Sequence, residues 1–192
     1  MRKPFILLFF LFLLGCTTAK ITSKAVPSNP VAYTFNVNID SARLLFRDAY
    51  FRYHNAMGFD LEYKDFQENA NSISSSDNKG KVQRKNGELT AYIVVTTDSS
   101  TVYRRTDGKA VPYSAECRLH FVPVEKDKVE VSVEVLSAWV ILGKQRLPSI
   151  PHFVQNDKVQ YVKPTTIEEY KLLLCFGKGL GIADQMPALK TL

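Results

Sequence analysis

The chain has 192 residues, 45% of them hydrophobic, and its formal net charge at pH 7 is +6. This length suits one domain that is large enough to bury a sizeable core. The basic excess is mild and spread along the chain, which indicates a solubilising surface charge rather than a nucleic-acid-binding surface.

The N-terminus carries the pattern of a cleaved export signal. Arg2 and Lys3 precede an unbroken apolar run over residues 5–14, and Gly15 and Cys16 follow it. A basic start, an apolar run and a small residue at the cut describe a secretory signal peptide. A membrane-spanning helix needs roughly 20 apolar residues, about twice this run, so a cleaved signal is favoured over a transmembrane anchor.

The four residues that end at Cys16 resemble the lipobox of bacterial lipoproteins. In that family the cysteine carries a diacylglycerol, the peptide is cleaved before it, and the new amino terminus is usually acylated. The resemblance implies removal of residues 1–15 and stable anchoring through the lipid on Cys16, since two acyl chains hold a protein in a membrane. Thr17, where an aspartate implies retention in the inner membrane of enterobacteria, favours the outer membrane over the inner membrane. No acidic cluster follows Cys16, which favours the periplasmic face over the cell surface.

Export narrows the range of expected partners. Removal of residues 1–15 takes away Arg2 and Lys3 and lowers the formal charge from +6 to +4. An exported protein meets little nucleic acid, so its acidic neighbours are expected to be lipid headgroups or lipopolysaccharide. The expected partners are therefore the membrane, through the lipid on Cys16, and another envelope protein.

Two further cysteines, Cys117 and Cys175, lie in apolar stretches. An even pair in an oxidising compartment allows a disulfide between them. The apolar neighbours favour the alternative, in which each is a buried free thiol that packs as a small hydrophobe.

The mature chain is expected to begin with a flexible tether over residues 16–31, followed by a single domain over residues 32–192. The tether contains Pro27 and Pro30 and lacks apolar periodicity. The domain begins with a strand over residues 32–37, in which apolar and polar residues alternate.

A helix follows this strand. Asp40 or Ser41 is the predicted N-cap, and Gly58 is placed where a helix ends with a left-handed residue. Seven residues at helical spacing form its apolar stripe. They are Ala42, Leu45, Phe46, Ala49, Tyr50, Tyr53 and Met57.

The middle of the chain predicts antiparallel hairpins. A strand over residues 59–64 comes first, followed by a mobile loop or a solvent-exposed edge region over 67–80. Asn86-Gly87 is the strongest turn signal, because both turn residues need a positive φ. The predicted pairs of strands are 81–85 with 88–97, 101–105 with 110–113, and 115–122 with 129–141.

The C-terminal part is expected to hold a turn-rich connection over residues 143–151, a short hairpin over 153–162 and a final helix. Thr165 with Glu168, or Thr166 with Glu169, has the spacing of a capping box. The helix is expected to end within the repeat of Gly177, Gly179 and Gly181, and the tail from Met186 is expected to fray.

This order of elements predicts an α+β fold, in which an antiparallel sheet of several hairpins carries helices packed on one face. The order over residues 31–142, together with the lipobox, resembles the TATA-binding-protein-like domains of small exported lipoproteins. Some of those lipoproteins are subunits of the outer-membrane protein assembly machine. Many others have no assigned function.

The sequence contains no recognisable metal or catalytic constellation, and no cofactor is expected. His54, His120 and His152 are far apart, with no zinc-ligand spacing, and the first two are interpreted as exposed. Glu168 and Glu169 are interpreted as an ordinary helix start. The Gly177, Gly179 and Gly181 repeat is interpreted as helix termination, because phosphate-binding glycine loops precede a helix.

Two places are candidates for interaction. Tyr103, Arg104 and Arg105 interleave aromatic and basic groups, although they also fit an edge strand protected by charge. Trp139 lies in a stretch where apolar residues occupy both phases of a strand. That pattern predicts either burial on both faces, which is favoured, or an exposed apolar patch.

Three functions are consistent with these features. The favoured one is a lipid-anchored, non-catalytic module that binds another envelope protein. The second is a carrier or sensor of a small apolar or lipidic ligand, held in a cavity between the sheet and the helix at residues 41–57. The third is an envelope hydrolase, which needs a nucleophile or an acid–base pair assembled from distant loops.

Overall fold

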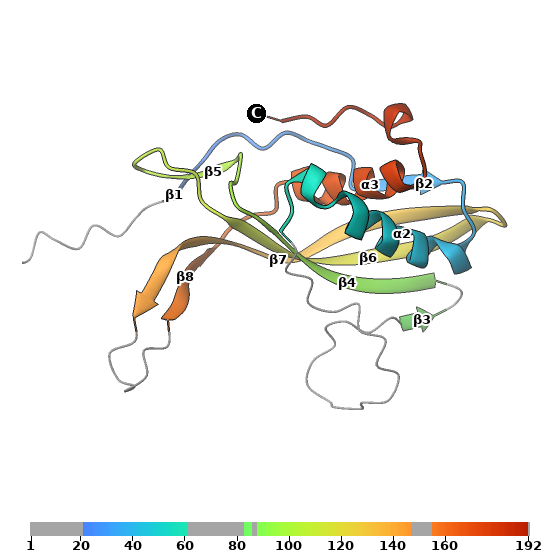
Figure 1. Cartoon of the computed structure of the whole chain (residues 1–192), viewed down its shortest axis with the longest axis horizontal. Helices are drawn as coiled ribbons and strands as arrows, with labels where there is room; N and C mark the ends of the chain where they lie inside the picture. Colours follow the sequence, from blue (N-terminus) through green and yellow to red (C-terminus); the bar gives the residue numbers. More distant parts are fainter. Residues whose placement is uncertain (1–20, 61–82, 86–87, 147–154, 192) are drawn as a thin grey trace, which may run out of the picture.

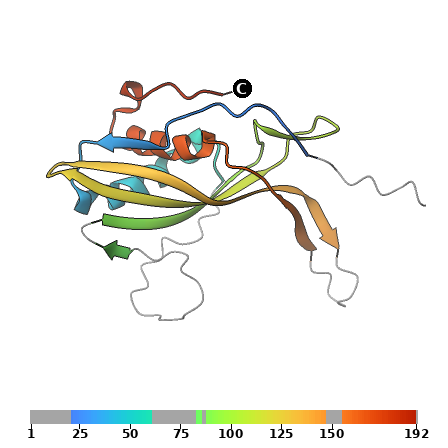
Figure 2. The ribbon, with the colours of Figure 1, turned by 180° about the vertical axis from the view of Figure 1, so that it is seen from behind.

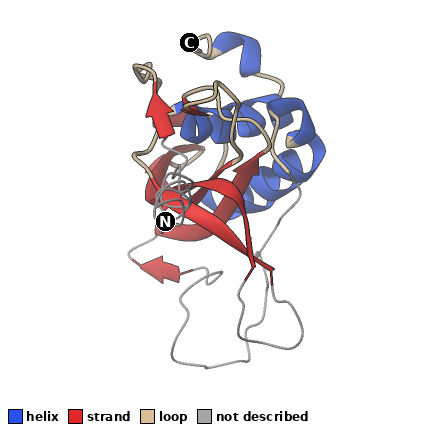
Figure 3. Cartoon of the chain, turned by 90° about the vertical axis from the view of Figure 1, so that its left-hand side faces the viewer, coloured by secondary structure: helices blue, strands red, loops and turns tan. Residues whose placement is uncertain are grey.

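The computed structural model describes residues 21–60, 83–85, 88–146 and 155–191. It has an α+β fold in which two helices, α2 (Ile39–Tyr53) and α3 (Ile167–Gly179), pack on one face of an antiparallel sheet (Figures 1 and 2). Viewed along the sheet, the helices form one layer and the strands the other (Figure 3). Some of the sequence expectations lie outside the described residues. They are those for Cys16, for residues 61–64 of the strand expected over 59–64, for the segment 67–80 and for His152.

The main sheet has six described strands in the order β2-β7-β6-β4-β3, with β8 paired to β7 as well. All of its pairs are antiparallel. The strands are β2 (Ala32–Phe35), β3 (Gln83–Lys85), β4 (Glu88–Thr97), β6 (Tyr113–Glu125), β7 (Lys128–Arg146) and β8 (Gln155–Tyr161).

Two of the predicted hairpins are confirmed by strand register. Lys85 pairs with Glu88 on either side of the Asn-Gly sequence, and Glu125 pairs with Lys128 across the β6–β7 turn. The predicted hairpin of 101–105 with 110–113 is reduced to a single bridge between Arg104 and Ala110, and Gly108 has φ +82° in its turn. Its strand β5 (Tyr103–Arg105) pairs instead with β1 (Ile21–Ser23) in a separate two-stranded ribbon.

Helix α2 confirms the predicted helix, but its N-cap residue differs from the predicted one, and fewer residues of the predicted apolar stripe are buried. Asn38 is the N-cap, rather than Asp40 or Ser41, because its side chain accepts a hydrogen bond from the Ser41 N–H at 2.9 Å. Its buried residues are Ala42, Phe46, Ala49 and Tyr50. Met57 belongs to a short 3₁₀ turn, η1 (Asn55–Met57), which ends at Gly58 with φ +72°.

Helix α3 ends within the glycine repeat, as the sequence predicts: its last residue is Gly179, and Leu180 is its C-cap. These glycines serve helix packing, since a Cβ on Gly179 would lie 2.4 Å from the Ala49 Cβ of α2, and one on Gly177 would lie 2.3 Å from the Met186 sulfur. Gly181, with φ +72°, follows the helix. The glycine repeat therefore brings α3 close to α2 and to the chain that follows it.

Both ends of the described chain are fixed to the domain, which differs from the flexible tether expected over 16–31, as far as residues 21–31 are described, and from the expected fraying from Met186. The Asn29 side chain exchanges two hydrogen bonds with the Lys190 backbone, at 2.9 and 3.1 Å. Thr166 accepts from the Asn29 N–H and donates to the Pro27 carbonyl. Tyr170 donates to the carbonyl of Pro187. The N-terminal segment and the tail thus hold each other across the N-terminus of α3.

The core lies between the helices and the inner face of the sheet. Phe46 of α2 packs edge-on against Phe121 of β6 and Phe176 of α3, with ring centroids 6.0 and 5.6 Å apart. Phe35 of β2 contacts Phe176 at 4.5 Å. The aromatic side chains thus fill the space between helix 41–57 and the sheet, where a ligand carrier would need its cavity.

Candidate interaction surface on the beta arm

A β-bulge explains the double apolar phase around Trp139. Cys117 faces Val135 and Glu116 faces Ser137, so Leu136 is an extra residue on β7. The inward phase therefore changes from odd positions before the bulge to even positions after it, and Leu136 is left 40% exposed. The predicted burial on both faces is wrong, because one face changes its phase halfway along the strand.

Beyond this bulge, β7 extends past the sheet. Its last pair with β6 joins Val140 to Tyr113, whereas its pairs with β8 run from Trp139 and Tyr161 to Arg146 and Gln155. We call residues 139–146 together with β8 the arm, and Figures 1 and 2 show it leaving the body of the domain. Strand pairing here corrects the expected turn-rich connection over 143–151 and the separate hairpin over 153–162.

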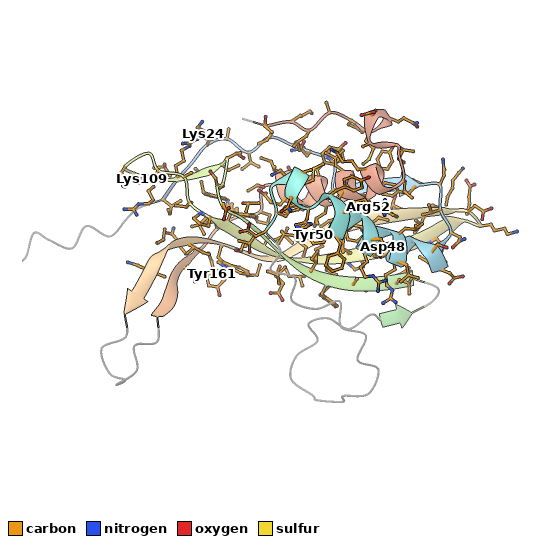
Figure 4. All side chains as sticks on the ribbon, viewed as in Figure 1. Lys24, Asp48, Tyr50, Arg52, Lys109 and Tyr161 are labelled. Carbon is orange, nitrogen blue, oxygen red and sulfur yellow. The ribbon has the colours of Figure 1, made fainter. Side chains whose placement is uncertain are left out.

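One face of the arm carries apolar and aromatic side chains, which we call the arm patch. It consists of two directly opposed pairs, Trp139 with Tyr161 and Ile141 with Val159. Tyr161 is 73% exposed and Val159 is 42% exposed, while Trp139 and Ile141 are half-buried. Figure 4 shows the labelled Tyr161 at the base of the arm. Exposed apolar groups that adjoin one another typically mark interaction sites.

Polar groups border the arm patch. The row of residues that contains Tyr161 and Trp139 continues across the sheet as Ser114 and Thr96, whose hydroxyl oxygens are 2.9 Å apart. Ser114 is buried and Thr96 is half-buried, so this hydroxyl pair satisfies itself beside the apolar pairs of the arm patch.

A shallow groove lies next to the arm. Its volume is about 320 Å³, and Ile141 joins it to the arm patch. Its other lining residues are Arg105, Lys109, Ala110, Val111, Pro112, Leu142 and Gly143. The floor is therefore largely apolar, and the basic groups come from the β5 hairpin.

The structure separates the three residues of the predicted aromatic–basic cluster. Tyr103 is a core residue, because its ring stacks on Tyr113 at 6.1 Å and its hydroxyl donates to the Lys163 carbonyl at 2.6 Å. Arg104 is exposed, and Arg105 forms an ion pair with Asp107 at 3.3 Å. Interaction through the Tyr103 ring is therefore excluded in this conformation, while Arg104 faces solvent and Arg105 is half-buried.

Sequence reasoning missed a pair of buried carboxyls at the start of α3. Glu168 and Glu169 are each only 3% exposed. The Thr165 hydroxyl donates to Glu168, whereas Oε2 of Glu169 has no hydrogen-bond partner among the described residues. Burial raises the pKa of both carboxyls, that of Glu169 to about 7. Their adjacency was visible in the sequence, but their burial follows from the packing of α3 on the domain.

The two cysteines are free, buried thiols, so the disulfide between Cys117 and Cys175 is not formed. Cys117 lies on the inner face of β6, and Cys175 lies on α3. Burial raises the pKa of Cys175 to about 12 and that of Cys117 well above its usual value. Both therefore act as apolar core residues rather than as nucleophiles.

The histidines show one confirmed and one wrong prediction. His120 lies on the outer sheet face, with Nε2 3.4 Å from the Glu134 carboxylate that also pairs with Arg118. His54 is buried rather than exposed, stacks on Tyr50 and places Nδ1 3.0 Å from the Phe51 carbonyl oxygen. In the described ranges, no three metal-ligating side chains come together.

No family model, no curated protein and no solved structure matches this chain. Within the part of the chain that the structure describes, no helix has both the length and the apolar character needed to cross a membrane.

Proposed function

We propose that this chain is a lipid-anchored envelope lipoprotein that binds another envelope protein through the arm patch. The observation that carries the proposal is the pairing of Trp139 with Tyr161 and of Ile141 with Val159 on one accessible face of a projecting ribbon. Membrane attachment rests on the lipobox resemblance at Cys16. The outer-membrane position rests on Thr17, and the periplasmic face rests on the lack of an acidic cluster after Cys16.

The chemistry of the arm patch suits a protein partner. Tryptophan and tyrosine supply a large contact area with few rotatable bonds, and both are enriched among the residues that dominate binding energy. The β7 backbone beyond Ile141 has β8 on one side, while its last hydrogen bond on the other side runs from the Ile141 N–H to the Pro112 carbonyl at 3.0 Å. An extended partner segment could pair along this edge while its side chains contact the arm patch.

Photo-crosslinking in cells tests this surface. A photoreactive residue at Val159, in the otherwise unchanged full chain, is expected to capture one dominant envelope protein. The matched position is Val124, which is 54% exposed at the opposite end of the sheet, and it should capture that protein weakly or not at all. Equal capture from both positions, or none from Val159, would contradict the proposed surface.

Truncation of the exposed aromatic side chain gives a second readout. Tyr161→Ser is expected to weaken partner capture by at least about tenfold, because aromatic anchors at interface centres commonly contribute 2 kcal/mol or more. Since Tyr161 is 73% exposed, the melting temperature should change little. Val124→Ser removes a comparably exposed apolar side chain far from the arm and should leave capture unchanged. Retained capture with Tyr161→Ser would remove the arm patch from the proposal.

Anchoring has its own test. Cys16→Ala is expected to release the protein from membranes or to leave the signal peptide attached, because no thiol remains to receive the diacylglycerol. Membrane fractionation and the mass of the purified chain distinguish these results. A processed variant that remains membrane-bound would defeat the lipoprotein assignment, while the arm patch could still bind its partner.

A further inference from the structure

The β1–β5 ribbon fixes the point at which the described chain begins. Ile21 pairs with Arg105, Thr22 with Arg104 and Ser23 with Tyr103. The Thr22 hydroxyl donates to the Arg104 carbonyl at 3.3 Å, and the Lys24 N–H donates to Val102 at 3.1 Å. The chain is therefore held to the domain from Ile21 onward.

This ribbon is basic. We call residues 21–24 and 102–110 the basic ribbon; they contain four basic side chains and one acidic side chain, a formal charge of +3. The basic groups are Lys24, Arg104, Arg105 and Lys109, and the acidic one is Asp107. Lys24, Arg104 and Lys109 are exposed. Figure 4 shows Lys24 and Lys109 at the same end of the molecule.

We propose that the basic ribbon rests on the anionic phospholipid headgroups of the membrane that holds the protein. The inference rests on the proposed lipidation of Cys16. Five residue steps separate Cys16 from Ile21, and an extended chain spans at most about 3.6 Å per residue, so Ile21 stays within about 18 Å of the lipidated residue. A tether that ran to residue 31 would have allowed the domain about three times that reach.

The short connection makes the ribbon charges effective. Electrostatic attraction to a membrane surface falls off over a Debye length, about 8 Å at physiological ionic strength. The anchor keeps the basic ribbon close enough to enter this range repeatedly. Each lysine or arginine near an anionic surface favours contact about fivefold, so three exposed basic groups bias the domain strongly toward one orientation.

This orientation deepens the proposed function. In Figures 1 and 2, β1, β5 and the arm lie toward one end of the sheet, and the β6–β7 turn lies at the other end. With the basic ribbon on the headgroups, the arm patch lies close to the bilayer. Its partner is then a protein that presents its binding surface near the same membrane.

Headgroup quenching tests the orientation directly. The full chain, processed and lipidated in cells, is reconstituted into vesicles that contain phosphatidylglycerol and a nitroxide-labelled headgroup. A fluorophore on Thr106→Cys, in the basic ribbon, should be quenched, while one on Asp127→Cys, in the β6–β7 turn, should not. Both positions are exposed, whereas Cys117 and Cys175 are buried and should not react.

The dependence of quenching on charge distinguishes electrostatic binding of the basic ribbon from mere closeness of the anchored domain to the membrane. Quenching at Thr106→Cys should fall in phosphatidylcholine vesicles and in 0.5 M salt. Adding Arg104→Glu and Lys109→Glu should lower the equilibrium constant for ribbon contact by at least about 25-fold. Lys126→Glu with Lys178→Glu, an equal charge change at exposed positions outside the ribbon, should leave quenching unchanged.

The outcomes distinguish the anchor from the ribbon. Protein that does not float with the vesicles overturns both proposals. Protein that floats but shows equal quenching at the two labelled positions, or quenching that ignores lipid charge and salt, overturns the basic ribbon alone.

Discussion

Glu169→Gln is expected to flatten the dependence of stability on pH between pH 5 and pH 8. Burial raises the pKa of Glu169 to about 7, compared with the ordinary value of 4.5. The native state therefore binds a proton more tightly than the unfolded chain over this range. Linkage predicts that the wild-type chain loses roughly 2–3 kcal/mol of unfolding free energy between pH 5 and pH 8 through this one group.

The sign follows from the direction of the shift. A carboxyl whose folded pKa is raised contributes its full stability below the unfolded pKa, near 4.5, and loses it as the pH rises toward the folded value. Glu168, whose pKa burial also raises, changes stability in the same direction. Acidic groups whose folded pKa is lowered act in the opposite direction at lower pH, so they contribute little above pH 5. Comparison of the variant with the wild type removes contributions that both chains share, such as those of the histidines.

Denaturant unfolding of both chains at several pH values measures the effect. Glu169→Gln should cost little at pH 5 beyond local repacking, and it should be relatively more stable than the wild type at pH 8. The matched control is Glu130→Gln, an exposed glutamate on β7, which should leave the pH dependence unchanged. Parallel pH profiles for wild type and Glu169→Gln would show that Glu169 is hydrated in solution.

The parts of the fold that the sequence predicted are those fixed by local patterns. Strand β4 alternates strictly, and Ala91, Ile93 and Val95 occupy its buried face as expected. The hairpins that pair Lys85 with Glu88 and Glu125 with Lys128 were predicted because short polar gaps between alternating strands are read within a few positions. The two helices were found because their apolar spacing is read within one segment.

The parts that the sequence did not predict depend on residues far apart along the chain. β1 becomes a strand because β5 offers it a partner more than 80 residues away. The Asn29 side chain bonds the Lys190 backbone across the whole domain, and one such side chain gives no periodic signal in the sequence. Propensity cannot detect such pairings, because each segment alone has the composition of a loop.

The sequence predicted only one part of the candidate site, for the same reason. Trp139 stood out because its apolar neighbours broke the alternation of a strand, but the cause was a bulge at Leu136 that no local rule places. Tyr161 and Val159 were not identified, since their register against β7 is set only after the second bulge, next to Gly143. Recognising the arm patch required the cross-strand pairs.

Gly179→Val is expected to destabilise the domain by about 3 kcal/mol or more. Any Cβ at this position would lie 2.4 Å from the Cβ of Ala49 and 3.3 Å from its Cα, so α3 would have to move away from α2. Removing a helical glycine normally gains up to about 1 kcal/mol. Overpacking a rigid contact with backbone nearby costs typically 1–3 kcal/mol, and the branched side chain adds further clashes.

The neighbouring residue supplies the matched control for this change. Lys178 lies on the exposed side of the same helix turn, so Lys178→Val introduces the same side chain with an expected loss below about 1 kcal/mol. Gly177→Ala should fall between the two, because its obstacle is the sulfur of Met186 at the end of a flexible side chain. Thermal unfolding of the three variants under one condition ranks them. Equal melting temperatures for Gly179→Val and Lys178→Val would show that α2 and α3 do not pack at this distance.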